Sequence, residues 1–178
     1  LPSYTPLGMA SLLPHRTIEY NDSYEVLVDG KVCASTEQRE AILQEYKVNS
    51  KCVQFDSLKT MKQADLRNIF TGQDVVYIYH NQIDNRGDKA ASENEVFTAC
   101  EEAIDEIYAM IKKLASQANT LHFIVTADHG FIYKRDKIGA NDKISGVASK
   151  SNSVGQRYSV SSKGLDADGV CQTTIGKV

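Results

Sequence analysis

Apolar residues are arranged along the chain in patterns that predict a mixed α/β fold. Continuous apolar runs typical of buried parallel strands occupy residues 74–79 and 121–126. Between them, over about 92–116, apolar residues recur at i, i+3 and i+4 spacing, which predicts a long amphipathic helix. A strand, a long helix and a second strand in this order predict a right-handed βαβ crossover whose two strands are parallel.

Smaller elements are predicted in the N-terminal half of the chain. Alternating runs on both sides of Asp29-Gly30 predict a β-hairpin. Residues 35–46 are predicted to form a helix capped by the hydroxyl residues at its start, and residues 52–55 a short strand. A further helix is expected over about 57–70, because its apolar residues share one side.

A short helix is predicted near the start of the chain. Pro6 suits its first turn, where the missing N–H has no intrahelical partner to lose, and Pro14 ends it. Thr5 is then expected to be the N-cap, with the free N–H groups of the helix converging on it. A hydroxyl in this position is well placed to attack phosphorus, although an ordinary Thr-Pro cap explains the same residues.

The C-terminal part of the chain differs in composition from the rest. Gly, Ser, Lys, Asp and Asn predominate there, with weak strand patterns at 156–161 and near the end. We therefore expect one partial domain over residues 1–178. Its core is expected at about 1–137, with a peripheral or lid segment at about 138–178.

Composition and charge exclude several classes of protein. The chain has 178 residues, 42% of them hydrophobic, which is typical of one globular domain. Its net charge of −3 excludes a globally basic nucleic-acid binder but leaves room for a local patch. It contains no apolar run of membrane-spanning length and no secretory signal pattern. Because it does not begin with Met, we expect it to be a piece of a longer polypeptide.

The four cysteines are scattered without any CxxC pair, which argues against a zinc site built from cysteines. Their spacing predicts free thiols, mostly buried as small hydrophobic residues, in a reducing cytoplasm.

Candidate chemistry follows the two predicted strands. Asp84 and Asp88 come shortly after the first strand, and Asp128 and His129 directly after the second. Because ligands bind beyond the carboxyl ends of parallel strands, these four groups are expected at one edge of the sheet. Mixed carboxylate and imidazole ligands suit zinc or manganese. Alternatively, the same residues are turn, cap or solvated loop residues.

Three further histidines were weighed as candidates. His15 and His122 are interpreted as structural or surface residues. His80 lies closer to the predicted cluster, where it either packs or orients a metal ligand.

The segments that contain Thr5, the two aspartates after the first strand, and the Asp-His pair after the second strand together resemble a known pattern. The segment Thr5-Pro-Leu-Gly-Met-Ala-Ser11 is similar to the nucleophile helix of the alkaline phosphatase superfamily. Asp84-Asn-Arg-Gly-Asp88 and Thr126-Ala-Asp-His-Gly130 resemble that superfamily's metal-ligand motifs. More narrowly, the order and spacing of these phrases over about residues 2–137 resemble the PglZ domain of phage-growth-limitation and BREX defence systems.

The resemblance implies an alkaline-phosphatase-like three-layer sandwich, here partial, with a mostly parallel central sheet and flanking helices. It also implies metal-dependent hydrolysis of a phosphate ester, preferably a phosphodiester such as nucleic acid. Thr5 is the implied nucleophile and forms a phosphothreonine. Asp84 and Asp88 are the implied ligands of one metal, and Asp128 and His129 those of the other, with zinc or manganese about 4 Å apart.

Two departures from the family pattern bear on activity. The superfamily uses a further Asp upstream of the nucleophile and a late His, and the chain has neither. We therefore expect the isolated chain to bind metal poorly and to be inactive. Asp88 stands where the superfamily has His, which favours oxygen-loving cations.

Two alternatives to an enzyme stay open. The domain could be a catalytically silent scaffold that binds other subunits of the defence complex. The motifs could also be coincidental in a generic α/β domain, in which case Asp84 and Asp128 would lie far apart.

Overall fold

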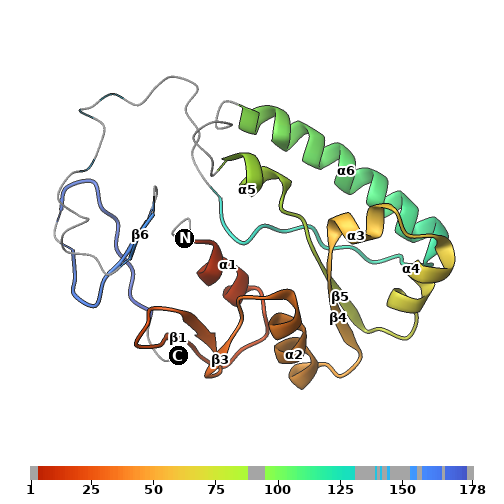
Figure 1. The fold of residues 1–178 in the computed structure, drawn as a ribbon, viewed down its shortest axis with the longest axis horizontal. Coiled ribbons are helices and arrows are strands. Elements are labelled where there is room, and N and C mark those ends of the chain that lie inside the picture. The colour runs from red at the N-terminus through yellow and green to blue at the C-terminus, as the bar shows by residue number, and fades with distance from the viewer. Residues whose placement is uncertain are drawn as a thin grey trace. The chain divides into compact units, whose positions relative to one another are not determined.

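The computed structural model describes residues 4–87 and 95–130, together with 139, 141, 144, 153–155, 158–165 and 167–175. The chain divides into two compact units (Figure 1). The first unit comprises Leu1–Gln38 and Thr126–Val178, and the second comprises Arg39–Val125. Each unit is described by itself.

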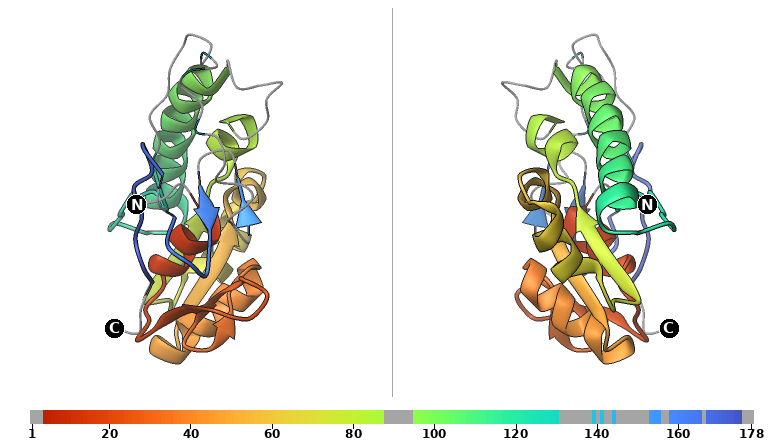
Figure 2. Two further views of the ribbon diagram at one scale, coloured as in Figure 1. Left: turned by 90° about the vertical axis from the view of Figure 1, so that its left-hand side faces the viewer. Right: turned by 90° about the vertical axis from the view of Figure 1, so that its right-hand side faces the viewer.

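The first unit contains a short helix, a three-stranded antiparallel sheet and a two-stranded hairpin. Its elements are α1 (Thr5–Ser11), β1 (Ile18–Tyr20), β2 (Val26–Val28), β3 (Lys31–Val32), β6 (Ser153–Val154) and β7 (Ser159–Val160). The sheet has the order β1-β2-β3, and α1 packs against β2 (Figure 2). Among the described residues no strand follows β7, so the strand pattern predicted near the end of the chain is wrong.

The predicted hairpin at Asp29-Gly30 is confirmed. Both turn residues adopt positive φ, 49° for Asp29 and 77° for Gly30, as a tight two-residue turn between twisted strands requires. The Asp29 carboxylate accepts hydrogen bonds from the backbone N–H groups of Arg16 (2.9 Å) and Thr17 (2.8 Å). The turn is therefore fixed both by its own backbone and by the segment that enters β1.

The first helix begins one residue earlier than predicted. Tyr4, with extended backbone (φ −119°, ψ 96°), occupies the N-cap position expected for Thr5. The carbonyl of Tyr4 accepts the N–H groups of Leu7 and Gly8, both at 3.0 Å, so the first turn closes around it. Consequently the Thr5 side chain does not cap the helix, and its hydroxyl is available to other partners.

The second unit is built from helices around a two-stranded parallel sheet. Its elements are α2 (Thr36–Tyr46), which begins in the first unit, β4 (Ser50–Gln54), α3 (Phe55–Lys59), α4 (Gln63–Phe70), β5 (Val75–Tyr79), α5 (Gln82–Gly87) and α6 (Val96–Gln117). The predicted capping of α2 is confirmed, because Ser35 and Gln38 bond each other's backbone N–H groups at 3.2 and 3.0 Å.

A parallel crossover is present, but one of its predicted strands is wrong. β5 pairs in parallel with β4, and α3 and α4 lie in the connection between them. The expected partner of β5, residues 121–126, forms no strand, and Ile124 and Leu121 are 94% and 73% exposed. A strand needs backbone partners, whereas an apolar run shows only that its side chains favour burial.

The helix predicted over 57–70 is divided into α3 and α4. Lys113, on α6, donates its ammonium to the carbonyls of Leu58 (2.9 Å) and Lys59 (2.8 Å). These are carbonyls that helix termination leaves without intrahelical partners, so a side chain from another helix ends α3.

The core of the second unit lies where α3 and α4 meet the C-terminal half of α6. Its buried members are Phe55, Leu58, Leu66, Met110, Leu114 and Ala118. The predicted long helix is confirmed as α6, and Val96, Ala103 and Leu114 of its apolar pattern are buried, but Ile104, which belongs to the same pattern, is 68% exposed. Figures 1 and 2 show α6 running beside α5 and α4. No helix in the described part of the chain is both long enough and apolar enough to span a membrane. All four cysteines are free, as expected.

Candidate functional site

Two predicted site residues meet in the first unit although they are far apart in the sequence. The hydroxyl oxygen Oγ1 of Thr5 lies 3.1 Å from Nε2 of His129, within hydrogen-bond distance. Thr5 is the first residue of α1, and the His129 side chain is 5% exposed. The start of α1 and the loop at His129 therefore hold a hydroxyl against a buried imidazole.

Asp128 adds a carboxylate to this pair. Its Oδ2 lies 3.5 Å from Nε2 of His129, too far for a strong hydrogen bond. Oδ2 of Asp128 and Nδ1 of His129 are both buried and have no hydrogen-bond partner among the described residues. Buried polar atoms are nearly always paired, and a carboxylate oxygen with an imidazole nitrogen is a donor set for zinc or manganese. The residues present thus fit a divalent cation.

Gly8 allows α1 to approach Asp128 closely. A Cβ atom at this position would lie 2.5 Å from the Asp128 carbonyl oxygen and 2.8 Å from its carbonyl carbon. The sequence motifs assigned no role to Gly8. The sequence nevertheless held an indication of its role, because glycine is unusual inside a short helix. Alanine is more favourable there by about 0.5–1 kcal/mol, unless close packing excludes a side chain.

Three tyrosines gather next to Thr5, and sequence reasoning missed them too. The Tyr4 ring lies 4.5 Å from the Tyr158 ring and 6.4 Å from the Tyr20 ring, measured between centroids. Burial, and then the proximity of the other two hydroxyls, raises the pKa of Tyr20 to about 12. These rings hold the N-cap residue that precedes Thr5.

The tyrosine cluster predicts a loss of stability in alkaline solution. The unfolded chain ionises Tyr20 near pH 10, whereas the folded chain keeps its proton to about pH 12, so stability falls as pH rises between these values. Thermal unfolding at pH 9 and pH 11 is expected to show a smaller drop in the Tyr20→Phe protein than in the wild type. The exposed Tyr108 supplies a matched Tyr→Phe control. An equal drop in all three proteins would contradict the prediction.

The other two predicted metal ligands are not residues of the first unit. Asp84 lies half-buried in the first turn of α5, shortly after β5, and belongs to the second unit. Asp88 lies outside the described residues. The first unit by itself therefore assembles Thr5, Asp128 and His129.

The remaining histidines have structural roles or lie at the surface. Nδ1 of His15 donates to the carbonyl of Leu13 at 2.7 Å, and His122 is exposed, as expected for both. His80 packs its ring edge-on against Phe55, with centroids 4.6 Å apart, and bonds Glu106 through Nε2 at 3.0 Å.

Comparison with known proteins places the sequence of this chain in a family. Residues 1–176 match the family model described as the BREX system PglZ alkaline phosphatase-like domain. The chain is 40% identical over 178 residues to the alkaline phosphatase-like protein PglZ of Bacillus cereus (strain H3081.97), covering 100% of this chain and 21% of that protein. It is 37% identical over 145 residues to the alkaline phosphatase-like protein BrxZ of Escherichia coli O9:H4 (strain HS), covering 80% of this chain and 16% of that protein.

The chain thus spans about a fifth of the length of these curated relatives, or less. No solved structure matches it significantly. Because the family model covers nearly the whole sequence, the chain belongs to the PglZ family of BREX alkaline phosphatase-like domains.

Proposed function

We propose that this chain supplies the nucleophile and part of the metal site of a phosphoester hydrolase in a BREX system, acting preferably on a phosphodiester such as nucleic acid. The observation that carries the proposal is the 3.1 Å distance between Thr5 Oγ1 and His129 Nε2. A threonine hydroxyl is a weak nucleophile, so it needs a neighbouring group that stabilises its alkoxide. In the tautomer with its proton on Nε2, His129 donates to Thr5 and leaves Nδ1 as a ligand atom.

The proposed reaction is a displacement at phosphorus. A bond forms between Thr5 Oγ1 and the phosphorus atom while the bond to the leaving alcohol breaks, and the proton of the Thr5 hydroxyl ends on the oxygen of that alcohol. Water then displaces Thr5: a bond forms between the water oxygen and phosphorus, a proton from the water returns to Thr5 Oγ1, and the phosphate product is released. The Nε2–H of His129 stabilises the Thr5 oxygen both when it attacks and when it leaves.

A divalent cation, zinc or manganese, is the proposed cofactor. Asp128 and His129 would hold one ion, and Asp84 and Asp88 a second. When bound, such ions lower the pKa of a hydroxyl and offset the charge that develops on the phosphoryl oxygens. The proposal requires the intact protein to bring Asp84 and Asp88 to the group formed by Thr5, Asp128 and His129.

We also propose a place for the parallel strands in the family fold, a cellular compartment and the partners of the domain. We place the β4–β5 pair in the mostly parallel central sheet of a three-layer sandwich, since both strands are parallel and connected through helices. The four free cysteines support a reducing compartment, the cytoplasm. Other subunits of the BREX system are the proposed partners.

Metal dependence tests the proposed function directly. The intact protein is expected to hydrolyse a chromogenic phosphodiester, to lose this activity after chelation, and to regain it with zinc or manganese. Asp128→Asn should lower the amount of bound metal, measured by elemental analysis, because the loss of a carboxylate charge weakens metal binding, and it should lower turnover by at least about 100-fold. Asp168→Asn, at an exposed carboxylate of the same unit, should change neither.

Unchanged metal content and turnover in Asp128→Asn would contradict the assignment of this ligand. No metal-dependent turnover in any of these proteins would instead favour the scaffold alternative, and binding to other BREX subunits would become the property to measure.

A further inference from the structure

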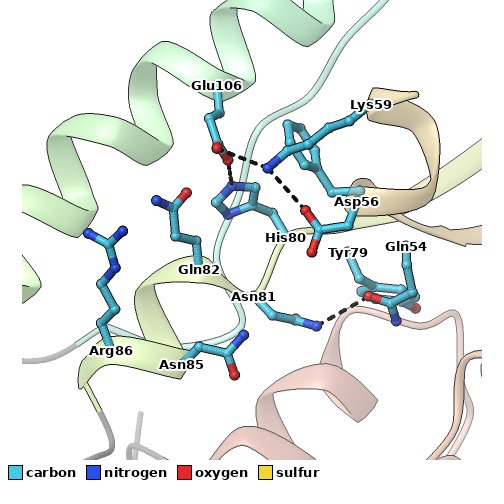
Figure 3. Close-up of a pocket in the computed structure, with 11 residues that line it drawn as sticks. Gln54, Asp56, Lys59, Tyr79, His80, Asn81, Gln82, Asn85, Arg86 and Glu106 are labelled. Atoms are coloured by element: carbon cyan, nitrogen blue, oxygen red, sulfur yellow. Dashed lines mark hydrogen bonds and ion pairs between the residues drawn. The ribbon is translucent and has the colours of Figure 1, made fainter. Parts of the chain in front are cut away.

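A polar cavity lies within the second unit, at the carboxyl ends of β4 and β5. Its volume is about 240 Å³, and residues from α3, α5 and α6 complete its walls (Figure 3). Ligands of parallel α/β sheets bind at this kind of edge. Neither Thr5, Asp84, Asp128 nor His129 lines the cavity, so it is separate from the site proposed above.

The charged groups of the cavity are already neutralised by one another. Lys59 bonds Asp56 at 3.0 Å and Glu106 at 2.9 Å, and Arg86 bonds Glu102 at 2.8 Å. Lys59, followed by His80, lowers the pKa of Glu106, which keeps that carboxylate charged. A phosphate or another anion would have to displace these carboxylates, so the walls favour an uncharged ligand.

The atoms that lack partners are mainly hydrogen-bond acceptors. His80 donates its Nε2–H to Glu106 at 3.0 Å, which leaves Nδ1 with a free lone pair. Gln82 donates to Glu102 at 2.8 Å, but its Oε1, although it has no partner among the described residues, is buried from solvent and is not open to a ligand. Asn81 donates to Gln54 at 3.2 Å, which leaves its Oδ1 available (Figure 3). A ligand that fits these atoms must donate hydrogen bonds.

Asn85 extends the same surface with a complete carboxamide. It lies on α5, lines the cavity, and its side chain has no partner among the described residues. Carboxamides both donate and accept, so Asn85 suits a group with alternating donor and acceptor capacity, as hydroxyls have. A phosphate monoester dianion, which can only accept hydrogen bonds, would leave Nδ1 of His80 unpaired.

We propose that this cavity binds an uncharged, polyhydroxylated group, namely one sugar ring. Sugar hydroxyls donate to Nδ1 of His80 and Oδ1 of Asn81 and accept from Asn85. The size of the cavity agrees, because about 240 Å³ lies below the roughly 300–1,000 Å³ of sites for drug-sized ligands. The sugar belongs either to a nucleoside or to a free saccharide, and both present the same hydroxyl chemistry. The site does not depend on the proposed hydrolase function.

Ligand-observed saturation-transfer NMR on the intact protein tests this site. Adenosine, glucose, 2′,3′-dideoxyadenosine and inorganic phosphate are the probes. Adenosine or glucose, or both, should bind at millimolar concentration, and which of them binds identifies the source of the sugar. Dideoxyadenosine, which keeps the base and the 5′-hydroxyl but lacks the 2′- and 3′-hydroxyls of adenosine, should bind more weakly, and phosphate should not compete.

Matched variants assign the binding to the cavity. Asn85→Ala is expected to weaken sugar binding about two- to tenfold, the loss of one or two hydrogen bonds, and Asn81→Ala to act similarly. Asn68→Ala, at an exposed asparagine of α4, is the control and should bind as the wild type does. Circular dichroism checks that the helices persist, and alanine favours the helix at positions 68 and 85.

Several outcomes overturn the proposal. They are the absence of binding by both adenosine and glucose, equal affinities of dideoxyadenosine and adenosine when adenosine binds, competition by phosphate, and unchanged binding in both Asn81→Ala and Asn85→Ala. None of these measurements requires hydrolytic activity. The proposal of a sugar site can therefore fail while the proposed hydrolase site at Thr5 stands, and the reverse also holds.

Discussion

Replacing Thr5 by valine is expected to abolish phosphodiester hydrolysis by the intact protein while its fold and metal content persist. Valine keeps the branched shape of threonine but lacks the oxygen that lies 3.1 Å from His129. Since the proposed mechanism passes through a covalent bond to that oxygen, turnover should fall at least about 10³-fold. The measurement is kcat for a chromogenic phosphodiester, with bound metal determined on the same samples.

Two companion variants sharpen this prediction. Thr5→Ser restores a hydroxyl and should recover part of the activity, which loss of packing alone does not explain. Thr60→Val makes the same chemical change at an exposed residue after α3 and should leave turnover as it is. Full activity in the Thr5→Val protein would exclude Thr5 as the nucleophile.

Gly8→Ala is expected to lower both stability and hydrolytic activity. A Cβ atom at this position would lie 2.5 Å from the Asp128 carbonyl oxygen, which is much shorter than a van der Waals contact. Because that oxygen belongs to the backbone, a change of side-chain rotamer cannot relieve the clash. Alanine would favour the helix by about 0.5–1 kcal/mol, but overpacking of this kind destabilises by about 1–3 kcal/mol. We therefore expect the net free energy of unfolding to fall. Relief of the clash also requires Asp128 and its neighbour His129 to move away from Thr5.

Thermal unfolding and turnover of the intact protein measure the two effects of Gly8→Ala. Gly164→Ala is the matched control in the same unit, because its Cβ would meet an atom only at 3.6 Å, an ordinary contact. We expect the control to unfold and turn over as the wild type does. A Gly8→Ala protein with wild-type activity would show that α1 can shift without disturbing the site.

The accuracy of the sequence-based predictions follows the range of the interactions involved. Asp29-Gly30 predicted its hairpin because a tight turn depends on two residues and their neighbours. The end of α3 was missed because Lys113, more than fifty residues further on, bonds its last carbonyls. The prediction of a strand at 121–126 was wrong because an apolar run does not indicate which backbone segment will pair with it.

The candidate site was also predictable only in part from the sequence. The kinds of group were readable from the motifs, since a hydroxyl, a carboxylate and an imidazole keep their chemistry wherever they lie. The role of Gly8 was not readable, because its missing side chain matters only where α1 meets Asp128. The tyrosines around Tyr4 are a similar case, since Tyr20 and Tyr158 come to it from distant segments.

Local sequence patterns were enough to predict the Asp29-Gly30 turn, the capped helix α2, the long helix α6, and the chemical groups that Thr5, Asp128 and His129 bring to the candidate site. The pairing of β5 with β4, and the contact of Thr5 with His129 in place of a helix cap, depend on tertiary packing. The physical reason is the range of the forces. Turn geometry, capping and periodicity act over a few residues, whereas strand pairing and side-chain contacts depend on segments that only packing brings together.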